Sequence, residues 1–461
     1  MVIGQAHGRD AMSARVAVVC GASMAGLLAA RVLADAYDSV IVVERDLLPD
    51  GVSQRPGVPQ GHHLHMLLSS GLRILERLFP GLIADLRAGG APTLDTRDLS
   101  LTYVEVSGHV LCRTGALADP DAMLTALASR PLLESVVRER VRALCNVSFR
   151  EGHDVIGPVL SGRAVSGVQV SERGTGRQCV LSADLVIDAT GRSARTPAFL
   201  AAQGFDRPVE QTYRVQLSYA SQLFRVPAGA MREKVAIISP TLQRPTGAGM
   251  LAYEDNTVIF TLIGVAGHRL PTDLTEIRSA AAELLPRHIH TVLEAAEPLG
   301  TLHNRQYPAS VWRRYDKLAS FPTGLLVIGD AVCSFNPVYG QGMTSAALQA
   351  RALQKVLANT GITELRRPYF RAAAHEIAPI WRANRLNDFA ATPTTGWATW
   401  PQRALDSYTR AYMAAASTDR ALTETFLRVL QGLDSGAALV GPGRVARVIA
   451  NARRRTQAQV A

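Results

Sequence analysis

The sequence predicts a mixed α/β fold, α+β overall, with three kinds of region along the chain. Residues 15–44 read as an apolar strand, a glycine-rich turn, a helix and a second strand that ends in an acid. Residues 211–265 are rich in strand patterns, and α/β patterning returns at residues 324–358 before a helical tail. We therefore expect a Rossmann-like domain built from discontinuous segments, an inserted β-sheet domain and a helical C-terminal region.

The composition is that of a globular protein. The 461 residues are 47% hydrophobic and 19% charged, which excludes collagen, low-complexity disorder and a disulfide scaffold. The formal net charge is +10, but all but three of the 49 basic side chains are arginines, and they are scattered rather than clustered. We expect no nucleic-acid partner, because such binding needs basic residues gathered on one face.

The chain has no sign of export. Residues 1–14 lack the apolar core of a signal peptide, and no apolar run approaches the roughly 18 residues of a membrane span. The five cysteines are widely spaced without a CxxC pair, as expected for reduced thiols. These features predict a cytoplasmic protein. The basic stretch 444–455 predicts a solvated helix, with membrane-surface contact as the alternative.

The first turn, Gly21–Gly26, has the features of a dinucleotide-binding loop. Gly21 permits a tight turn, and the helix that follows offers unpaired N–H groups to a pyrophosphate. Ser23 stands where the middle glycine of GxGxxG is usual, and it is still small enough for close backbone approach. Glu44 ends the second strand, where a ribose hydroxyl would lie.

The elements that follow alternate in type. A helical region over 123–142, capped by Asp119 to Asp121 and interrupted near Pro131, precedes a hairpin around Gly174. Residues 183–191 read as a buried strand that ends in a glycine turn. In the central block, Tyr213 and Tyr219 lie on an alternating strand, where they face either a substrate or the core.

A second glycine-rich turn lies roughly 310 residues after the first. Gly329 and Asp330 follow a buried strand, and a helix begins near Gly342. Two such turns favour one extended cofactor, FAD, with its ADP half on the first turn and its ribitol and isoalloxazine on the second. The Asp330 carboxylate can accept hydrogen bonds from ribityl hydroxyls, and the helix dipole stabilises negative charge on a reduced flavin.

These motifs resemble the FAD-dependent monooxygenases with the para-hydroxybenzoate hydroxylase fold, and within them the squalene-epoxidase-like enzymes and bacterial polyether polyene epoxidases. The resembling segments are 21–26, 43–46, 55–60 with His62 and His65, 129–133, 188–191, 329–330 and 336–343. The resemblance implies that Glu44 binds ribose, Arg45 lies beside adenine, and Arg55 and Arg130 reach the phosphates or ribityl chain. The implied cofactor-binding residues are Gly21, Ser23, Met24, Ala25, Gly26, Glu44, Arg45, Arg55, Arg130, Val147 (through its backbone to adenine), Thr190, Gly191, Gly329, Asp330, Pro337 (against the flavin ring), Gly340, Gly342 and Met343.

The resemblance also implies chemistry carried by the flavin, with O2 as co-substrate and a C4a-hydroperoxide as oxygen donor. The implied reaction is epoxidation or hydroxylation of an apolar precursor in secondary metabolism, such as a polyene, polyketide or isoprenoid. The candidate flavin-adjacent residues are His65, Pro337 and Tyr339. Alternatives are an FAD-dependent reductase of prenyl double bonds, a non-redox flavoprotein cyclase and a cofactor-binding protein without catalysis.

The source of electrons stays open. Thr190 occupies the place of an aspartate that many single-component relatives use with the nicotinamide cofactor. NAD(P)H therefore reduces the flavin either directly or through a separate flavin reductase as partner.

Two further motifs favour plainer interpretations. We expect no metal at His62, His63 and His65, because no acidic or cysteine partner lies at ligand spacing. Trp397 and Trp400 resemble the tryptophan motif of flavin halogenases, but that family's catalytic lysine has no candidate before Lys234. These tryptophans are instead candidates to line an apolar substrate pocket or to pack helices.

The expected domain boundaries follow from this order. The FAD-binding segments are 15–100, 119–205 and 306–360, the substrate-domain segments are 101–118 and 206–305, and the helical cover is 361–461.

Overall fold

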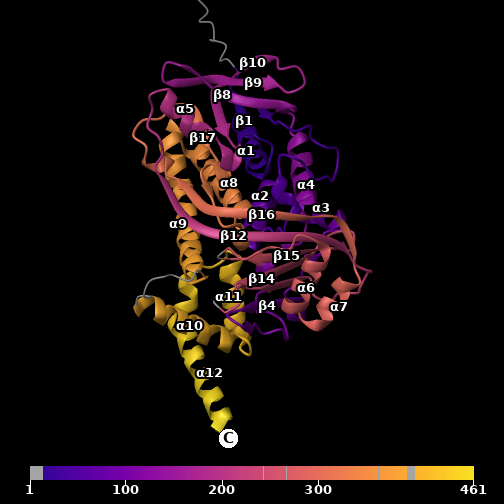
Figure 1. Ribbon diagram of the computed structural model, residues 1–461. Coiled ribbons are helices and arrows are strands. Elements are labelled where there is room, and N and C mark those ends of the chain that lie inside the picture. The colour runs from indigo at the N-terminus through magenta and orange to yellow at the C-terminus, as the bar shows by residue number, and fades with distance from the viewer. Residues whose placement is uncertain (1–13, 242, 266, 361–363, 392–399, 461) are drawn as a thin grey trace, which may run out of the picture.

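The computed structural model describes residues 14–460, apart from residues 242, 266, 361–363 and 392–399. Its upper part in Figure 1 is built on a five-stranded parallel sheet in the order β17-β11-β1-β2-β7. The strands are β1 (Val16–Cys20), β2 (Ser39–Val43), β7 (Val147–Arg150), β11 (Leu185–Asp188) and β17 (Leu325–Val327). Three separate parts of the chain thus share one sheet, and the predicted α/β class is confirmed.

Helices and a small sheet pack around these strands. The helices are α1 (Met24–Ala34), α2 (Ser69–Leu78), α3 (Leu82–Ala88), α4 (Arg130–Arg142), α5 (Thr196–Ala202) and α8 (Gly342–Asn359). Helix α8 packs against both α1 and α2. An antiparallel sheet of β8 (His153–Ser161), β9 (Ala164–Glu172) and β10 (Gln178–Ser182) contacts β2 and β11, and its β9–β10 turn is the hairpin predicted around Gly174. Val18 and Val19 are fully buried, as expected for the middle of a parallel sheet.

The inserted domain is an eight-stranded sheet in the order β18-β16-β12-β15-β14-β13-β4-β5. Its strands are β4 (Thr102–Val106), β5 (His109–Val110), β12 (Glu210–Arg225), β13 (Val235–Ile238), β14 (Thr246–Ala252), β15 (Thr257–Gly264), β16 (Glu297–Arg313) and β18 (Cys333–Ser334). Helices α6 (Leu274–Leu284) and α7 (Arg287–Glu294) share an apolar core with one face, which includes Phe224 and Phe260. The opposite face is therefore available to the rest of the molecule (Figure 1).

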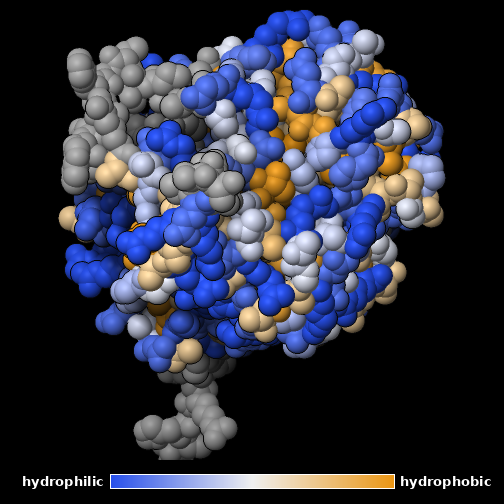
Figure 2. Space-filling view, turned by 90° about the horizontal axis from the view of Figure 1, so that it is seen from below, coloured by the Kyte–Doolittle hydropathy of each residue, from blue (hydrophilic) through white to orange (hydrophobic). Residues whose placement is uncertain are grey.

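The C-terminal part is helical, as predicted. It consists of α9 (Arg366–Ala391), α10 (Trp400–Ala416), α11 (Arg420–Leu430) and α12 (Pro442–Val460). Helix α9 packs against α8. The later helices share a second core with the region of β4, and this core includes Val104 of β4 and Tyr412 of α10. No helix among the described residues has the length and apolarity to cross a membrane. Figure 2 shows this end of the molecule, which is largely hydrophilic with smaller hydrophobic areas between.

Three local predictions need correction. The helix expected over 123–142 begins only at Arg130, because Ser129 caps it and Pro131 occupies its first turn; the short strand β6 (Thr125–Ala126) precedes it and pairs with β3 (Thr93–Leu94). The boundary expected at residue 306 falls inside β16, which continues to Arg313 because it pairs with β12 as far as Glu210. A bulge between Arg214 and Leu217 adds one residue to β12 and interrupts the expected alternation there.

Candidate active site

The carboxyl ends of three adjacent parallel strands bring the two glycine-rich turns together. The Ala189 N–H donates to the Cys20 carbonyl (2.9 Å), and the Ile328 N–H donates to the Asp188 carbonyl (3.0 Å). A Cβ placed on Gly329 would lie 2.6 Å from the Cβ of Ala25 in the first turn. The chain leaves β1 toward β2 on one side and returns to β11 on the other, and ligands bind at such a switch point in open α/β sheets.

The first turn offers unpaired N–H groups at the start of α1. Its N-cap residue, Ser23, makes no side-chain cap, and its Oγ instead accepts a hydrogen bond from Arg130 Nη2 (2.8 Å). The first-turn N–H groups of an α-helix have no intrahelical acceptors, so those of Met24 and Ala25 are placed for an anion. The arrangement fits the pyrophosphate of FAD.

The second turn places Asp330 beside the start of α8. Solvent reaches its side chain, yet desolvation by the surrounding protein raises its pKa against the opposing charges of Arg130 and Arg192. Gly342 opens α8 nearby, since a Cβ on it would lie 4.0 Å from Asp330 Oδ1. A carboxylate beside a helix N-terminus fits the ribityl hydroxyls and the pyrimidine edge of a flavin.

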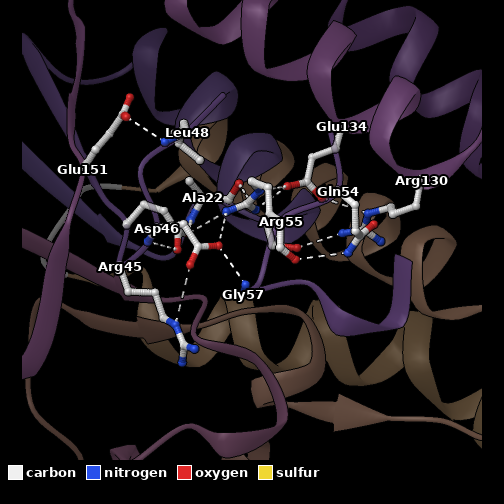
Figure 3. A network of polar contacts seen from close by, with 12 residues as sticks. Ala22, Arg45, Asp46, Leu48, Gln54, Arg55, Gly57, Arg130, Glu134 and Glu151 are labelled. Carbon is white, nitrogen blue, oxygen red and sulfur yellow. Dashed lines mark hydrogen bonds and ion pairs between the residues drawn. The ribbon is translucent and has the colours of Figure 1, made fainter. Parts of the chain in front are cut away.

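A buried network of charges supports the first turn (Figure 3). Glu44 accepts hydrogen bonds from the N–H groups of Ala22 (2.7 Å) and Asp46 (3.1 Å). Glu134, on α4, accepts from Arg55 Nε (2.8 Å) through one oxygen and from Arg130 Nε (2.9 Å) through the other. The side chains of this network are all at least nine-tenths buried, so ion pairs removed from water hold the turn. They are the carboxylates of Glu44, Asp46 and Glu134 and the guanidiniums of Arg55 and Arg130.

The network engages the guanidinium of Arg55. It contacts Glu134, Asp46 (3.2 Å) and the Ala22 carbonyl (3.2 Å). These contacts brace the turn. Arg130 does extend from Glu134 to Ser23, and thus to the position expected for the phosphates.

The two adenine-side candidates lie at different places around β2 and β7. Arg45 follows Glu44 with an exposed side chain, 4.0 Å from Asp46 at its nearest nitrogen. Val147 pairs with Val40 at the amino end of β7. The carboxyl end of β7 is formed by Arg150, whose carbonyl accepts from the Glu44 N–H (2.9 Å).

The turn after β11 is held by one carboxylate. Asp188 accepts from both the N–H (2.9 Å) and the Oγ1 (2.6 Å) of Thr190, and also from Thr196 Oγ1. Thr190 is exposed, and Gly191 beside it has a φ of +80° that favours glycine. The position that carries aspartate in many relatives is thus filled by a threonine turned back onto its own strand.

The segment that contains three histidines lies on the inserted sheet. His63 Nδ1 and Ser221 Oγ are 2.9 Å apart, and the His62 ring stacks on His303 with a centroid distance of 3.8 Å. The Tyr253 hydroxyl clamps the backbone of His65, accepting from its N–H (2.8 Å) and donating to its carbonyl (2.7 Å).

All three histidines are held neutral. Burial, aided by neighbouring histidines and Arg305, lowers the pKa of His63 to about 3, and burial with Arg130 lowers that of His65 to about 4. Burial and His303 lower the pKa of His62. His65 Nδ1 donates to the His63 carbonyl (2.9 Å), which leaves Nε2 as an acceptor. Among the described residues, no three His, Cys, Asp or Glu side chains converge as metal ligands.

These histidines predict acid sensitivity. An unfolded histidine has a pKa of about 6.5. Below that pH the unfolded state binds protons at these two imidazoles, whereas His63 and His65 stay neutral in the native state. Stability is therefore full above pH 7 and falls as pH decreases, by about 2 kcal/mol per histidine at pH 5. Denaturant titrations at pH 7 and pH 5 measure this loss. His63→Asn should reduce it, the exposed His268→Gln should not, and equal losses in both variants would contradict the assignment.

The remaining candidates divide between the site and the core. Tyr219 meets His63 edge-on (4.5 Å between centroids), whereas Tyr213, beyond the bulge, packs against Trp381 of α9 (4.8 Å). Pro337 is exposed and Tyr339 half-buried in the turn before Gly340, and Met343 is buried in the first turn of α8. Trp397 lies outside the described residues, as does the side chain of Trp400.

Several site residues were not predicted from the sequence. Asp46 and Glu134 complete the buried network, and Tyr253 clamps His65. Tyr307 of the inserted sheet lies near Asp330 and Arg192, and Arg305 lies near Tyr219. Only the i,i+4 spacing of Arg130 and Glu134 gave a usable signal, and it does not reveal burial.

Comparison with known proteins agrees with this geometry. The model of a family described as "FAD binding domain" matches residues 13–362. Protein Rv3254 of Mycobacterium tuberculosis (strain ATCC 25618 / H37Rv) is 41% identical over 91% of this chain and 90% of its own. Kynurenine 3-monooxygenase of Salinispora arenicola (strain CNS-205) is 26% identical over 71% of this chain and 69% of its own. The crystal structure of p-nitrophenol 4-monooxygenase PnpA from Pseudomonas putida DLL-E4 has the same fold, with a TM-score of 0.64, 17% identity, and coverage of 92% of this chain and 99% of that one.

Proposed function

This chain belongs to the FAD binding domain family and is an FAD-dependent monooxygenase or oxidoreductase, and we propose that it epoxidises or hydroxylates an apolar natural-product precursor. A polyene, polyketide or isoprenoid is the proposed substrate class, by resemblance to the squalene-epoxidase-like enzymes. The proposal rests on one observation above all. The two glycine turns meet at the carboxyl ends of the parallel strands, and Asp330 there is near enough to Tyr307 of the inserted sheet to raise the pKa of its hydroxyl.

When bound, FAD supplies the redox chemistry and the activation of O2. The protein's groups would position it: the α1 N-terminus would bind the pyrophosphate, Glu44 would accept from the ribose, and Asp330 would accept from the ribityl chain. The N-terminal dipole of α8 favours negative charge at the pyrimidine edge. His65, neutral and fixed by Tyr253, holds an acceptor at Nε2.

An apolar wall supports the proposed substrate class. Leu64 packs so closely over Gly249 that a Cβ there would lie 2.6 Å from a Leu64 methyl. Leu64 and Met66 pack with Leu251 and Ile259 on the face of the inserted sheet opposite α6 and α7. These side chains exclude water from that part of the sheet and favour an apolar substrate surface.

We propose that electrons come from a separate flavin reductase. Thr190 presents no carboxylate at the position that relatives use with the nicotinamide cofactor, and its hydroxyl is engaged by Asp188.

An isotope experiment tests the proposal. FAD-loaded protein is supplied with ¹⁸O2, NADPH and polyene, polyketide and isoprenoid precursors, with and without an added flavin reductase. We expect products that carry one ¹⁸O atom, formed at least tenfold faster with the reductase. Products without ¹⁸O would contradict oxygenation: hydride incorporation under nitrogen would indicate a prenyl reductase, and isomerisation without O2 uptake a cyclase. Equal rates with and without the reductase would contradict the separate electron source.

A further inference from the structure

A row of polar side chains follows β12 and β16 on the face of the inserted sheet opposite α6 and α7. Directly paired residues of antiparallel strands share a face. The pairs here are Ser221 with His303, Tyr219 with Arg305, and Leu217 with Tyr307. His303, Arg305 and Tyr307 therefore line this face beside Tyr219.

Two segments from outside the inserted sheet contact this row. On one side, His63 contacts both Tyr219 and Ser221. On the other, Arg192 follows the turn after β11 and lies over the Tyr307 ring, 4.5 Å from its centroid. Arg192 is also near enough to Asp330 to oppose the rise of its pKa. The row thus faces the position where a substrate would meet the flavin.

Two guanidiniums on this surface have no counter-ion among the residues that the structure describes. Within the described part of the chain, no carboxylate oxygen lies within 4.0 Å of Arg192 or Arg305. Most arginines nearby differ: Arg55, Arg130 and Arg313 are all ion-paired. Arg305 is exposed, and the adjoining histidines are neutral and add no charge. Arg192 opposes the rise in the pKa of Asp330 without forming an ion pair with it.

We propose that Arg192 and Arg305, with the hydroxyls of Tyr219 and Tyr307, form a subsite for the carboxylate of the substrate. This inference rests on the proposed oxygenation and narrows its substrate class to an apolar chain or ring that bears a carboxylic acid. Covering two unpaired guanidiniums with hydrocarbon alone would be costly, whereas a carboxylate accepts planar, charge-assisted hydrogen bonds from them. The apolar body would then lie along Leu64 and Met66, at the neighbouring part of the same face.

Binding of matched acids and amides tests the subsite without turnover. The probes are geranate and 4-phenylbutyrate, each compared with its primary amide, titrated into FAD-loaded protein by calorimetry. We expect at least one acid to bind at least tenfold more tightly than its amide. Arg305→Met and Arg192→Met should each reduce that ratio below threefold and leave amide affinity unchanged, and Arg305→Lys should restore part of it. Arg225→Met is the matched control, because Arg225 lies at the far end of β12 and pairs with Glu297.

The possible outcomes separate this subsite from the proposed reaction. Equal affinity for acid and amide, no binding of either acid, or an unchanged ratio in Arg305→Met would each overturn the subsite. An unchanged ratio in Arg305→Met is expected if the guanidiniums only stabilise negative charge on the reduced flavin. The FAD content of each variant is measured, so that lost acid binding with full FAD content supports the subsite and lost FAD counts against it. Selective acid binding by a protein that fails the ¹⁸O2 test would overturn the oxygenation and leave the anion site standing.

Discussion

Replacing Gly26 with alanine is expected to abolish FAD binding and to destabilise the fold. A Cβ at this position would lie 2.9 Å from the carbonyl carbon of Gly21 and closer still to its oxygen. Both are backbone atoms of the same tight turn, and the Ala189 side chain behind it is only 3.4 Å away. Helix α1 would have to lift from β1 and β11, at a cost of about 3 kcal/mol or more.

The expected readouts are a melting temperature lowered by several degrees and a bound FAD content reduced at least tenfold. Gly174→Ala is the control, because no atom lies within 4 Å of its Cβ position in the β9–β10 turn. It should leave both quantities unchanged. A Gly26→Ala protein with full FAD content would contradict the close contact between the two ends of the turn.

Local signals explain why the two glycine turns could be predicted from the sequence. Gly21 and Gly329 adopt φ values of +110° and +71°, which glycine accepts and other residues rarely do. Gly21 directly follows the buried strand β1, and Gly329 comes one residue after β17. Residue type and position relative to a strand end therefore sufficed to place Glu44 and Asp330 next to these strand ends. The parallel sheet that joins them follows from the same pattern, since buried parallel strands read as short continuous apolar runs.

Local capping decided one position that sequence reasoning missed, and tertiary context decided the others. The helix expected from residue 123 begins at Arg130, because Ser129 and Pro131 form a stronger start than the acidic turn before them. The bulge in β12 separates Tyr213 from Tyr219, and no local residue preference marks it. Arg55 has the right residue type for a phosphate contact, but in the structure it pairs with the nearby Glu44 and Asp46 and with Glu134, which is distant in sequence. Pairing between segments distant in sequence has no signature in a single sequence.

The largest consequence of that pairing concerns Glu134, and Glu134→Gln is expected to cost about 3–5 kcal/mol of unfolding free energy. Burial alone would raise the pKa of this carboxyl, but the charges of Arg130 and Arg55 lower it, so the group is ionised at neutral pH. The glutamine keeps the shape and removes the charge, which leaves Arg130 buried without a counter-ion. Because the folded pKa lies below the unfolded value, this stabilisation is present above about pH 4.5 and is lost in acid.

The same substitution should also weaken FAD binding, because Glu134 holds the guanidinium that reaches Ser23 in the first turn. Glu139→Gln is the matched control: Glu139 lies on the same helix but is exposed, and its loss should change stability by less than about 0.5 kcal/mol. Denaturant unfolding of both variants, followed by FAD titration of the refolded proteins, separates the two effects. A Glu134→Gln protein as stable as Glu139→Gln would show that water or the cofactor, and not this carboxylate, neutralises Arg130. Replacing Glu134 and Arg130 together by apolar residues should cost less stability than Glu134→Gln alone, since the ion pair is removed as a unit and Arg55 keeps Glu44 and Asp46 as counter-ions, while FAD binding should still be lost.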